Sequence, residues 1–295
     1  MKIRSLLVLV LFATLTTDLL AMSEEKEIEL GREEHKKIIS QYGVYENKTL
    51  QDYVTMVGKR VAAFSSRPNL EYQFTVLNDA AINAFALPGG FIYITRGMLT
   101  HMNSESELAA VLGHEIAHVT ERHALRRNRA RTGVNLINSV ASAVVYSQMG
   151  SVASAGLSEL GSMYGGVLVT GYSREYELEA DEVGARFMAK AGYNPQAMLR
   201  TIDILKAKDR IEIEQARLEK RKPEIYHGFL STHPDHDTRY KQAIEASMNL
   251  ASEYSEFITT DDFLEKLNGL AYGSGRQVGV IRGNIFYHPK LGIKL

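Results

Sequence analysis

The segment from Leu108 to His123 constrains this chain most, because it contains the run His114-Glu115-Ile-Ala-His118. Two histidines four residues apart lie on one face of an α-helix, so both imidazoles can reach the same zinc ion. A glutamate directly after the first histidine can act as general base toward a water molecule at that ion. The run therefore predicts a helix that carries two metal ligands and a base.

The surrounding sequence favours a helix over a chance match. Ser104 and Glu107 form a capping box, which gives the helix a defined start. Apolar residues then recur at helical spacing, namely Leu108, Val111, Leu112, Ile116 and Val119. The alternative is a surface helix that happens to carry two histidines, and the cap and the apolar stripe weigh against it.

Composition narrows the class of protein. The chain has 295 residues, of which 45% are hydrophobic and 23% charged, as expected of a globular protein with a core. Its net charge is −1, so no basic field points to nucleic acid. Cysteine is absent, so any metal site must use histidines and carboxylates. Structural zinc sites usually include cysteine, which favours a catalytic site.

The N-terminus predicts export. Lys2 and Arg4 precede the apolar run 6–15, which is short for a membrane span, and cleavage after Ala21 would make 1–21 a signal peptide. The alternative is an uncleaved segment that anchors the protein.

Local patterns predict helices over 23–40 and 50–63, and strands over 71–78 and 91–95. Residues 88–90, Pro-Gly-Gly, predict a turn. Two strands joined by a turn thus lead into the histidine helix. An edge strand beside a metal site can hold an extended peptide by backbone hydrogen bonds, and the alternative is an ordinary core hairpin.

The segment 133–172 is rich in Gly, Ala, Ser and Val, with Glu159 as its one charged residue. It is too polar and too often interrupted by glycine for a membrane span. We expect an apolar helical pair that covers the site or docks on another molecule, with membrane contact as the alternative.

A catalytic zinc needs a third protein ligand. The helix after Ser173 offers Glu177 and Asp181 on one face, with Glu179 and Glu182 turned away. One carboxylate can bind zinc, and the other can accept a hydrogen bond from a ligand histidine. The small residues Ala180 and Gly184 also predict that this helix packs closely on the histidine helix.

Four segments occur in a telling order: Asn83–Gly90, HEIAH, Ser173–Gly184 and Ser231–Pro234. Together they resemble the BepA/HtpX/Oma-type family of zinc metallopeptidases over roughly residues 25–253. The resemblance implies an α+β fold, mainly helical and zincin-type, with a small sheet beside the HExxH helix.

The resemblance also implies roles for individual residues. His114, His118 and Glu177 would hold one Zn²⁺ per chain, Asp181 would support a ligand histidine, and Glu115 would be the catalytic base.

His233 and Arg239 are candidate donors to the oxyanion that forms during peptide hydrolysis. His233 could instead take the fourth zinc position and close the site, or be a solvated loop histidine. Of the other histidines, His123 is predicted to be a surface residue, since it lies off the face of the two ligands. No partner pattern marks His35, His101, His227, His236 or His288.

The resemblance implies an exported, periplasmic zinc endopeptidase that hydrolyses misfolded or misassembled cell-envelope proteins. Expected partners are unfolded protein substrates and the assembly machinery of outer-membrane proteins, with peripheral membrane contact and no nucleic acid. The competing class is a chaperone-like protein that binds clients through 133–172 with weak or conditional proteolysis. The glutamate of HEIAH favours the enzyme, because a binding protein needs no general base.

The predicted organisation is a signal peptide over 1–21, a metallopeptidase domain over 22–253 and a short C-terminal extension over 254–295. The extension resembles the opening of an extra domain in some exported members of the family, and it shows no helical repeats.

Overall fold

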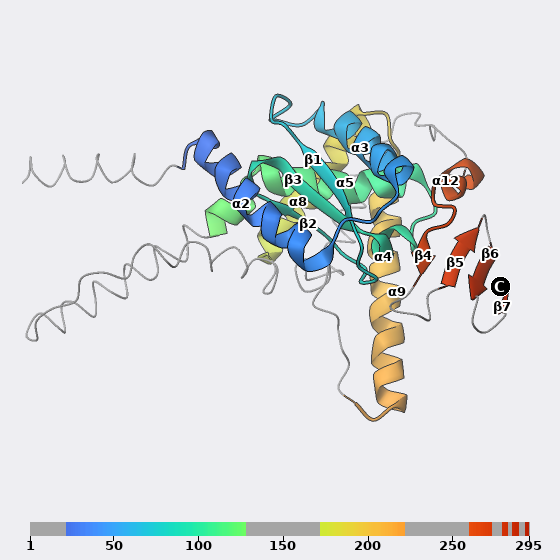
Figure 1. Ribbon diagram of the computed structural model, residues 1–295. Helices are drawn as coiled ribbons and strands as arrows, with labels where there is room; N and C mark the ends of the chain where they lie inside the picture. The colour runs from blue at the N-terminus through green and yellow to red at the C-terminus, as the bar shows by residue number, and fades with distance from the viewer. Residues whose placement is uncertain are drawn as a thin grey trace, which may run out of the picture.

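The computed structural model describes residues 22–127, 172–221 and 260–272, and the strand residues 279–282, 285–288 and 293–294. Its helices are α2 (Glu24–Tyr42), α3 (Lys48–Ala62), η1 (Pro88–Gly90, a 3₁₀ turn), α4 (Arg96–Leu99), α5 (Glu105–Thr120), α8 (Arg174–Lys190), α9 (Ala197–Leu218) and α12 (Thr260–Lys266). Its strands are β1 (Gln73–Leu77), β2 (Ala84–Leu87), β3 (Phe91–Thr95), β4 (Ala271–Tyr272), β5 (Gly279–Arg282), β6 (Ile285–His288) and β7 (Ile293–Lys294). The arrangement in Figure 1 confirms the predicted fold class, mainly helical with a small sheet beside the HEIAH helix.

The sheet beside that helix has the strand order β1-β3-β2. β1 and β3 are the two predicted strands, but they run parallel, so the prediction that a turn joins them directly is wrong. β2 lies between them in the chain and pairs antiparallel with β3. The sequence did not single out β2, because Ala-Phe-Ala-Leu is buried throughout and lacks polar alternation. The predicted Pro-Gly-Gly turn is η1, which joins β2 to β3. Gly89 has φ 79° there, and a Cβ atom at this residue would lie 2.6 Å from the Cα of Ile28.

The small sheet is covered on both faces (Figure 1). Alternate residues of β3 point to opposite sides. Phe91 and Tyr93 join Ile38 of α2 in one apolar cluster. Ile92 and Ile94 belong to the main core, together with residues of α3, α5 and α8. The sheet therefore lies between Ile38 of α2 and the helices that carry the HEIAH run and the acidic motif, which is Glu177 with Asp181.

Side-chain caps explain where the helices begin. Ser23 accepts from Lys26 N and starts α2, close to the predicted start. Asn47 accepts from Leu50 N, so α3 begins two residues before the predicted position. Ser104 accepts from Glu107 N at the start of α5, as the capping box predicts. Ser173 occupies the N-cap of α8, but its side chain makes no capping hydrogen bond.

Helices α5 and α8 approach each other at two glycines. A Cβ atom at Gly184 would lie 2.8 Å from the carbonyl carbon of Gly113 and 2.9 Å from the backbone nitrogen of His114. Such distances are well inside van der Waals contact, so no larger residue fits without moving the helices. The predicted close packing of the two helices is present, and it brings the acidic motif next to the histidines.

The first turn of α5 holds a buried carboxylate, that of Glu105. Tyr53 Oη donates to it at 2.6 Å, Tyr193 Oη at 2.8 Å, and Arg60 Nη1 lies 3.2 Å away. We call these four residues the Glu105 cluster. Burial, with the neighbouring carboxylate, raises the pKa of both tyrosines well above their usual value.

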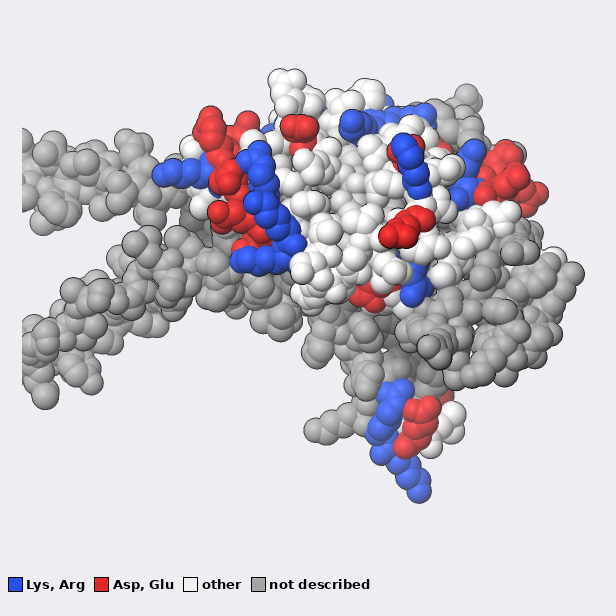
Figure 2. Space-filling model, in the orientation of Figure 1, with Lys and Arg blue, Asp and Glu red and all other residues white. Residues whose placement is uncertain are grey.

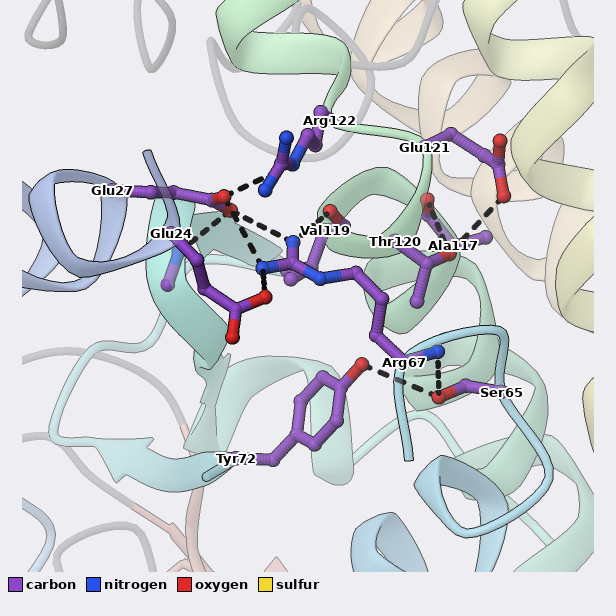
Figure 3. A network of polar contacts seen from close by, with 11 residues as sticks. Glu24, Glu27, Ser65, Arg67, Tyr72, Ala117, Val119, Thr120, Glu121 and Arg122 are labelled. Atoms are coloured by element: carbon purple, nitrogen blue, oxygen red, sulfur yellow. Dashed lines mark hydrogen bonds and ion pairs between the residues drawn. The ribbon is translucent and has the colours of Figure 1, made fainter. Parts of the chain in front are cut away.

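A second polar network ties α2 to the end of α5 (Figure 3). The buried carboxylate of Glu27 accepts from Arg67 Nη1 at 2.9 Å, lies 3.1 Å from Arg122 Nε, and accepts from Gly89 N at 3.2 Å. Arg67 also donates to the carbonyl oxygen of Val119, in the last turn of α5. The network fixes the point where the chain leaves the HEIAH helix.

The C-terminal elements pack partly on the main core. Phe263, Leu267 and Leu270 are buried in the same apolar cluster as α3 and α5. Arg96 Nη1 donates to the carbonyl oxygen of Ala271 at 2.8 Å. Beyond this point β4, β5, β6 and β7 form an antiparallel sheet in that order. The limits 22–253 and 254–295 stay predictions.

Charges of both signs gather along α2, whereas the surface between α2 and α3 carries few of them (Figure 2). This mixture agrees with a net charge near zero. Within the described part of the chain, every helix is too short or too polar to span a membrane.

Candidate metal centre

Three buried side chains with acceptor atoms meet between α5 and α8. His114 and His118 lie one turn apart on α5, with their Nε2 atoms 2.9 Å from each other. Glu177 of α8 places one carboxylate oxygen 3.5 Å from His114 Nε2 and the other 3.5 Å from His118 Nε2. All three side chains are almost completely buried. The structure thus brings together the three predicted ligands, and this group could hold a metal ion.

The donor set fits a zinc ion. Zinc binds imidazole nitrogen at about 2.0–2.1 Å in tetrahedral geometry, which puts neighbouring ligand atoms roughly 3.3 Å apart. The observed separations of 2.9–3.5 Å bracket that value. Two imidazoles and one carboxylate also match the ligand type of catalytic zinc sites, which leave one position open.

Asp181 lies one turn after Glu177 on α8 and supports the first histidine. Its Oδ1 is 2.8 Å from His114 Nδ1. An ionised carboxylate only accepts hydrogen bonds, so Nδ1 of a neutral imidazole must carry the proton. The lone pair of His114 is then on Nε2, which faces His118 and Glu177. Of the two carboxylates, Glu177 thus lies against both Nε2 atoms, and Asp181 lies against Nδ1 of His114.

Glu115, the predicted base, follows His114 in α5 and is fully buried. A glutamate next in sequence to a metal-ligating histidine on a helix is the type of residue that can take up a proton from a metal-bound water molecule.

The predicted surface position of His123 is wrong, because its side chain is fully buried. The prediction extended the helical face of His114 and His118, but α5 ends at Thr120. Arg122 then adopts φ 53°, a left-handed conformation that reverses the chain. His123 is carried back against α5, and its Nδ1 lies 2.7 Å from His118 Nδ1.

Glu179 was predicted to turn away from the site, and it does lie away from the three acceptor atoms. It nevertheless contacts the far side of His123, with Oε2 3.1 Å from Nε2, and it accepts from Arg126 at 2.8 Å. Burial alone would raise the pKa of Glu179, but the hydrogen bonds from Arg126 and His123 lower it. Burial lowers the pKa of His123 to about 4, against the opposing effect of Glu179.

Aromatic rings hold the histidines in place. Tyr172 stacks on His118 with ring centroids 4.1 Å apart, and Tyr176 stacks on His123 at 4.6 Å. A small cavity beside them is lined by Ala86 and Leu87 of β2, by His118 and by Tyr172. The sequence analysis missed these aromatic contacts, and their one signal in the sequence is the presence of Tyr172 and Tyr176 near the start of α8.

Several predictions lie outside the described residues. They include His233, Arg239, the signal peptide over 1–21, and the apolar segment 133–172 except for Tyr172.

Comparisons with known proteins agree with this geometry. The sequence model of "Peptidase family M48" matches residues 48–247. The chain is 28% identical over 265 residues to the "Beta-barrel assembly-enhancing protease" of Escherichia coli (strain K12), covering 86% of this chain and 50% of that protein. It is 31% identical over 229 residues to the "Mitochondrial metalloendopeptidase OMA1" of Schizosaccharomyces pombe, covering 76% of this chain and 62% of that one.

The chain thus spans about half the length of the curated relatives it matches first. The matched range 48–247 contains the HEIAH run and the acidic motif of α8. The family resemblance inferred from the motifs is confirmed.

Proposed function

Because the chain belongs to peptidase family M48 and hence to the metallopeptidases, we propose that it is a zinc-dependent endopeptidase. The observation that carries the proposal is the convergence of buried acceptor groups from His114, His118 and Glu177, with the buried residue Glu115 directly after His114 in the same helix. Lone pairs that converge in a buried place repel one another unless a cation lies between them.

Each residue has a distinct role in this proposal. His114, His118 and Glu177 hold the metal, and Asp181 keeps His114 in the tautomer that presents Nε2. A bound zinc ion would polarise the substrate carbonyl and make a water molecule more acidic. Glu115 accepts the proton of the attacking water and then delivers it to the nitrogen of the leaving amine.

The position of β2 suggests how a peptide is held. β2 lies at an edge of its sheet, and its residues Ala86 and Leu87 line the cavity next to His118. An extended substrate could add to this edge through backbone hydrogen bonds, which would make binding independent of most side chains. The competing view, an ordinary core hairpin, predicts no effect of backbone changes in β2 on substrate binding.

His233 and Arg239 remain our candidates for stabilising the oxyanion. His233 could alternatively occupy the fourth zinc position and keep the site closed. Replacing His233 by alanine separates these roles: loss of activity with metal affinity unchanged supports the first, and a gain in activity with weaker metal binding supports the second. Activity and metal affinity that both match the unmodified protein would exclude both.

We further propose that the substrates are misfolded or misassembled cell-envelope proteins. One relative is named for enhancing β-barrel assembly, which supports this choice and a link to the outer-membrane assembly machinery. Residues 1–21 would export the chain to the periplasm, either cleaved as a signal or retained as an anchor. The chaperone-like alternative shares these clients but requires no peptide hydrolysis.

The decisive experiment pairs bound-metal analysis with cleavage of an unfolded protein substrate. It compares the full chain with Glu115→Gln and with Glu182→Gln, a control that removes an exposed carboxylate from α8. We expect close to one zinc ion in all three proteins. We expect cleavage by the unmodified chain and the control, and a loss of about 10²–10⁴-fold in Glu115→Gln.

Zinc in every protein without cleavage by any of them would refute the endopeptidase proposal and favour the client-binding alternative. Absence of zinc from the unmodified chain would refute the metal site itself.

A further inference from the structure

The back of the metal centre holds a second pair of polar side chains, His123 and Glu179. His123 contacts Nδ1 of His118, whereas Nε2 of His118 faces Glu177. Neither His123 nor Glu179 belongs to the group that could hold the ion.

The number of donors and acceptors on each group determines the direction of the hydrogen bonds from His118 to Glu179. The carboxylate of Glu179 only accepts, so His123 Nε2 at 3.1 Å must carry its proton. A neutral imidazole has one donor nitrogen and one acceptor nitrogen, so Nδ1 of His123 is the acceptor. His118 Nδ1, 2.7 Å away, must then be the donor. The lone pair of His118 is left on Nε2, where it points at His114 and Glu177.

We infer that His123 is a positioning residue that, oriented by Glu179, fixes the tautomer and ring orientation in which His118 binds the metal. This inference rests on the proposed function. It gives His118 the same support that Asp181 gives His114, but through a neutral imidazole placed between the ligand and a carboxylate. Such partners raise the basicity of the ligand and hold its ring in place.

The surrounding structure keeps His123 in position. The left-handed residue Arg122 makes the turn, and its guanidinium is paired with Glu27 of α2 (Figure 3). Tyr176 stacks on the His123 ring with an interplanar angle of 12°. The Cζ atom of Arg126 lies over the Tyr176 ring, 4.6 Å from its centroid, and Arg126 also donates to Glu179. A residue in strained backbone beside a functional group is a feature that surrounding contacts must maintain.

The competing explanation is that His123 only fills space beneath the site. Two variants separate the possibilities. His123→Asn keeps an acceptor, because Oδ1 of asparagine is as many bonds from the backbone as Nδ1 of histidine. His123→Phe keeps the ring and its stacking on Tyr176 but removes the acceptor.

The experiment measures zinc affinity of the full chain by competition with a chelator, and the absorption spectrum of the Co²⁺-substituted protein. We expect His123→Phe to bind zinc about 10–100-fold more weakly, with a changed Co²⁺ spectrum. We expect His123→Asn to stay within about 3-fold of the unmodified chain, on the same reasoning. Circular dichroism of the metal-free proteins reports whether each variant is folded.

Equal zinc affinity of His123→Phe and the unmodified chain would overturn the inference, as would an equal loss in both variants. If His123→Phe does not fold, Glu179→Met and Glu179→Gln replace the pair, since only glutamine keeps an oxygen that can accept from His123. Weaker zinc binding in Glu179→Met alone would support the inference, and equal binding in both would overturn it. Absence of zinc from the unmodified chain would instead refute the proposed function.

Discussion

The helix α5 carries two buried polar clusters of opposite character. In its first turn, three side chains direct donor hydrogens at the carboxylate of Glu105. In its second half, His114 and His118 meet Glu177 with acceptor atoms facing one another. The side chains of both clusters are almost fully excluded from solvent, except that of Arg60, which is 35% exposed.

This difference between donors around an acceptor and acceptors facing one another distinguishes a cluster that stabilises the fold from one that can bind a ligand. In the Glu105 cluster, donor groups point at a carboxylate that accepts from them, so donors and acceptor are satisfied together. The cluster joins α3, α5 and the segment after α8. Acceptors that converge on one point are completed only by a proton or a cation. The first arrangement stabilises the fold, and the second favours the binding of a metal ion.

The largest expected effect comes from exchanging an acceptor for a donor at the metal centre. Glu177→Gln should weaken zinc binding roughly 10²–10³-fold, because a total binding free energy of about 10–16 kcal/mol is shared among about four ligands. The amide of glutamine can donate to one Nε2 atom, so the metal-free protein should gain about 1 kcal/mol of stability. Zinc competition and urea unfolding measure the two effects, with Glu182→Gln as control. A variant that loses metal-free stability would contradict the contrast between the clusters.

The same exchange in the other cluster should give the opposite result. Glu105→Gln replaces a charged acceptor by an amide, whose NH₂ group would face either the donor of Tyr53 or those of Tyr193 and Arg60. We expect the free energy of unfolding to fall by about 2–3 kcal/mol, with zinc affinity of the folded protein unchanged. Urea unfolding of the metal-free protein checks the first part. A change in zinc affinity comparable to that of Glu177→Gln would show that the clusters are coupled.

The contact between the helices that carry the metal cluster is the next test. Gly184→Ala forces the backbones of α5 and α8 apart, because the new methyl group would overlap Gly113. We expect a loss of roughly 2 kcal/mol in stability and weaker zinc binding, since Glu177 moves with α8. Thermal unfolding and zinc competition are the measurements. Glu182→Ala, at an exposed position of α8, is the control.

The smallest effect is a pH dependence of the Glu105 cluster. Burial raises the pKa of Tyr53 in the folded protein, whereas the unfolded chain loses this proton near pH 10. The folded state therefore binds more protons above about pH 10, and stability falls as pH rises beyond that value. Urea unfolding of metal-free protein between about pH 8 and pH 11 should show this slope, and Tyr53→Phe should reduce it. An unchanged slope in Tyr53→Phe would assign the effect to other groups, and Tyr272→Phe, at an exposed position, is the control.

Much of the metal centre was predictable from sequence, because it depends on local periodicity. Residues four apart on a helix share a face, which paired His114 with His118 and Glu177 with Asp181. The absence of cysteine restricted the ligands to histidines and carboxylates. The capping box placed the start of α5 correctly, and Gly184 marked the face on which α8 packs. These features are set by residues close together in the chain.

The remaining features depend on contacts between distant segments, which periodicity does not encode. β2 exists because β3 and α5 bury it, and its four residues carry no strand pattern of their own. His123 lies against His118 because α5 stops at Thr120 and the chain reverses direction at Arg122, which is paired with Glu27 some 95 positions earlier. The sequence by itself determined which atoms can bind a metal. The tertiary structure decided which nitrogen of each histidine faces the other ligands, because that depends on the partner on the other side of the ring.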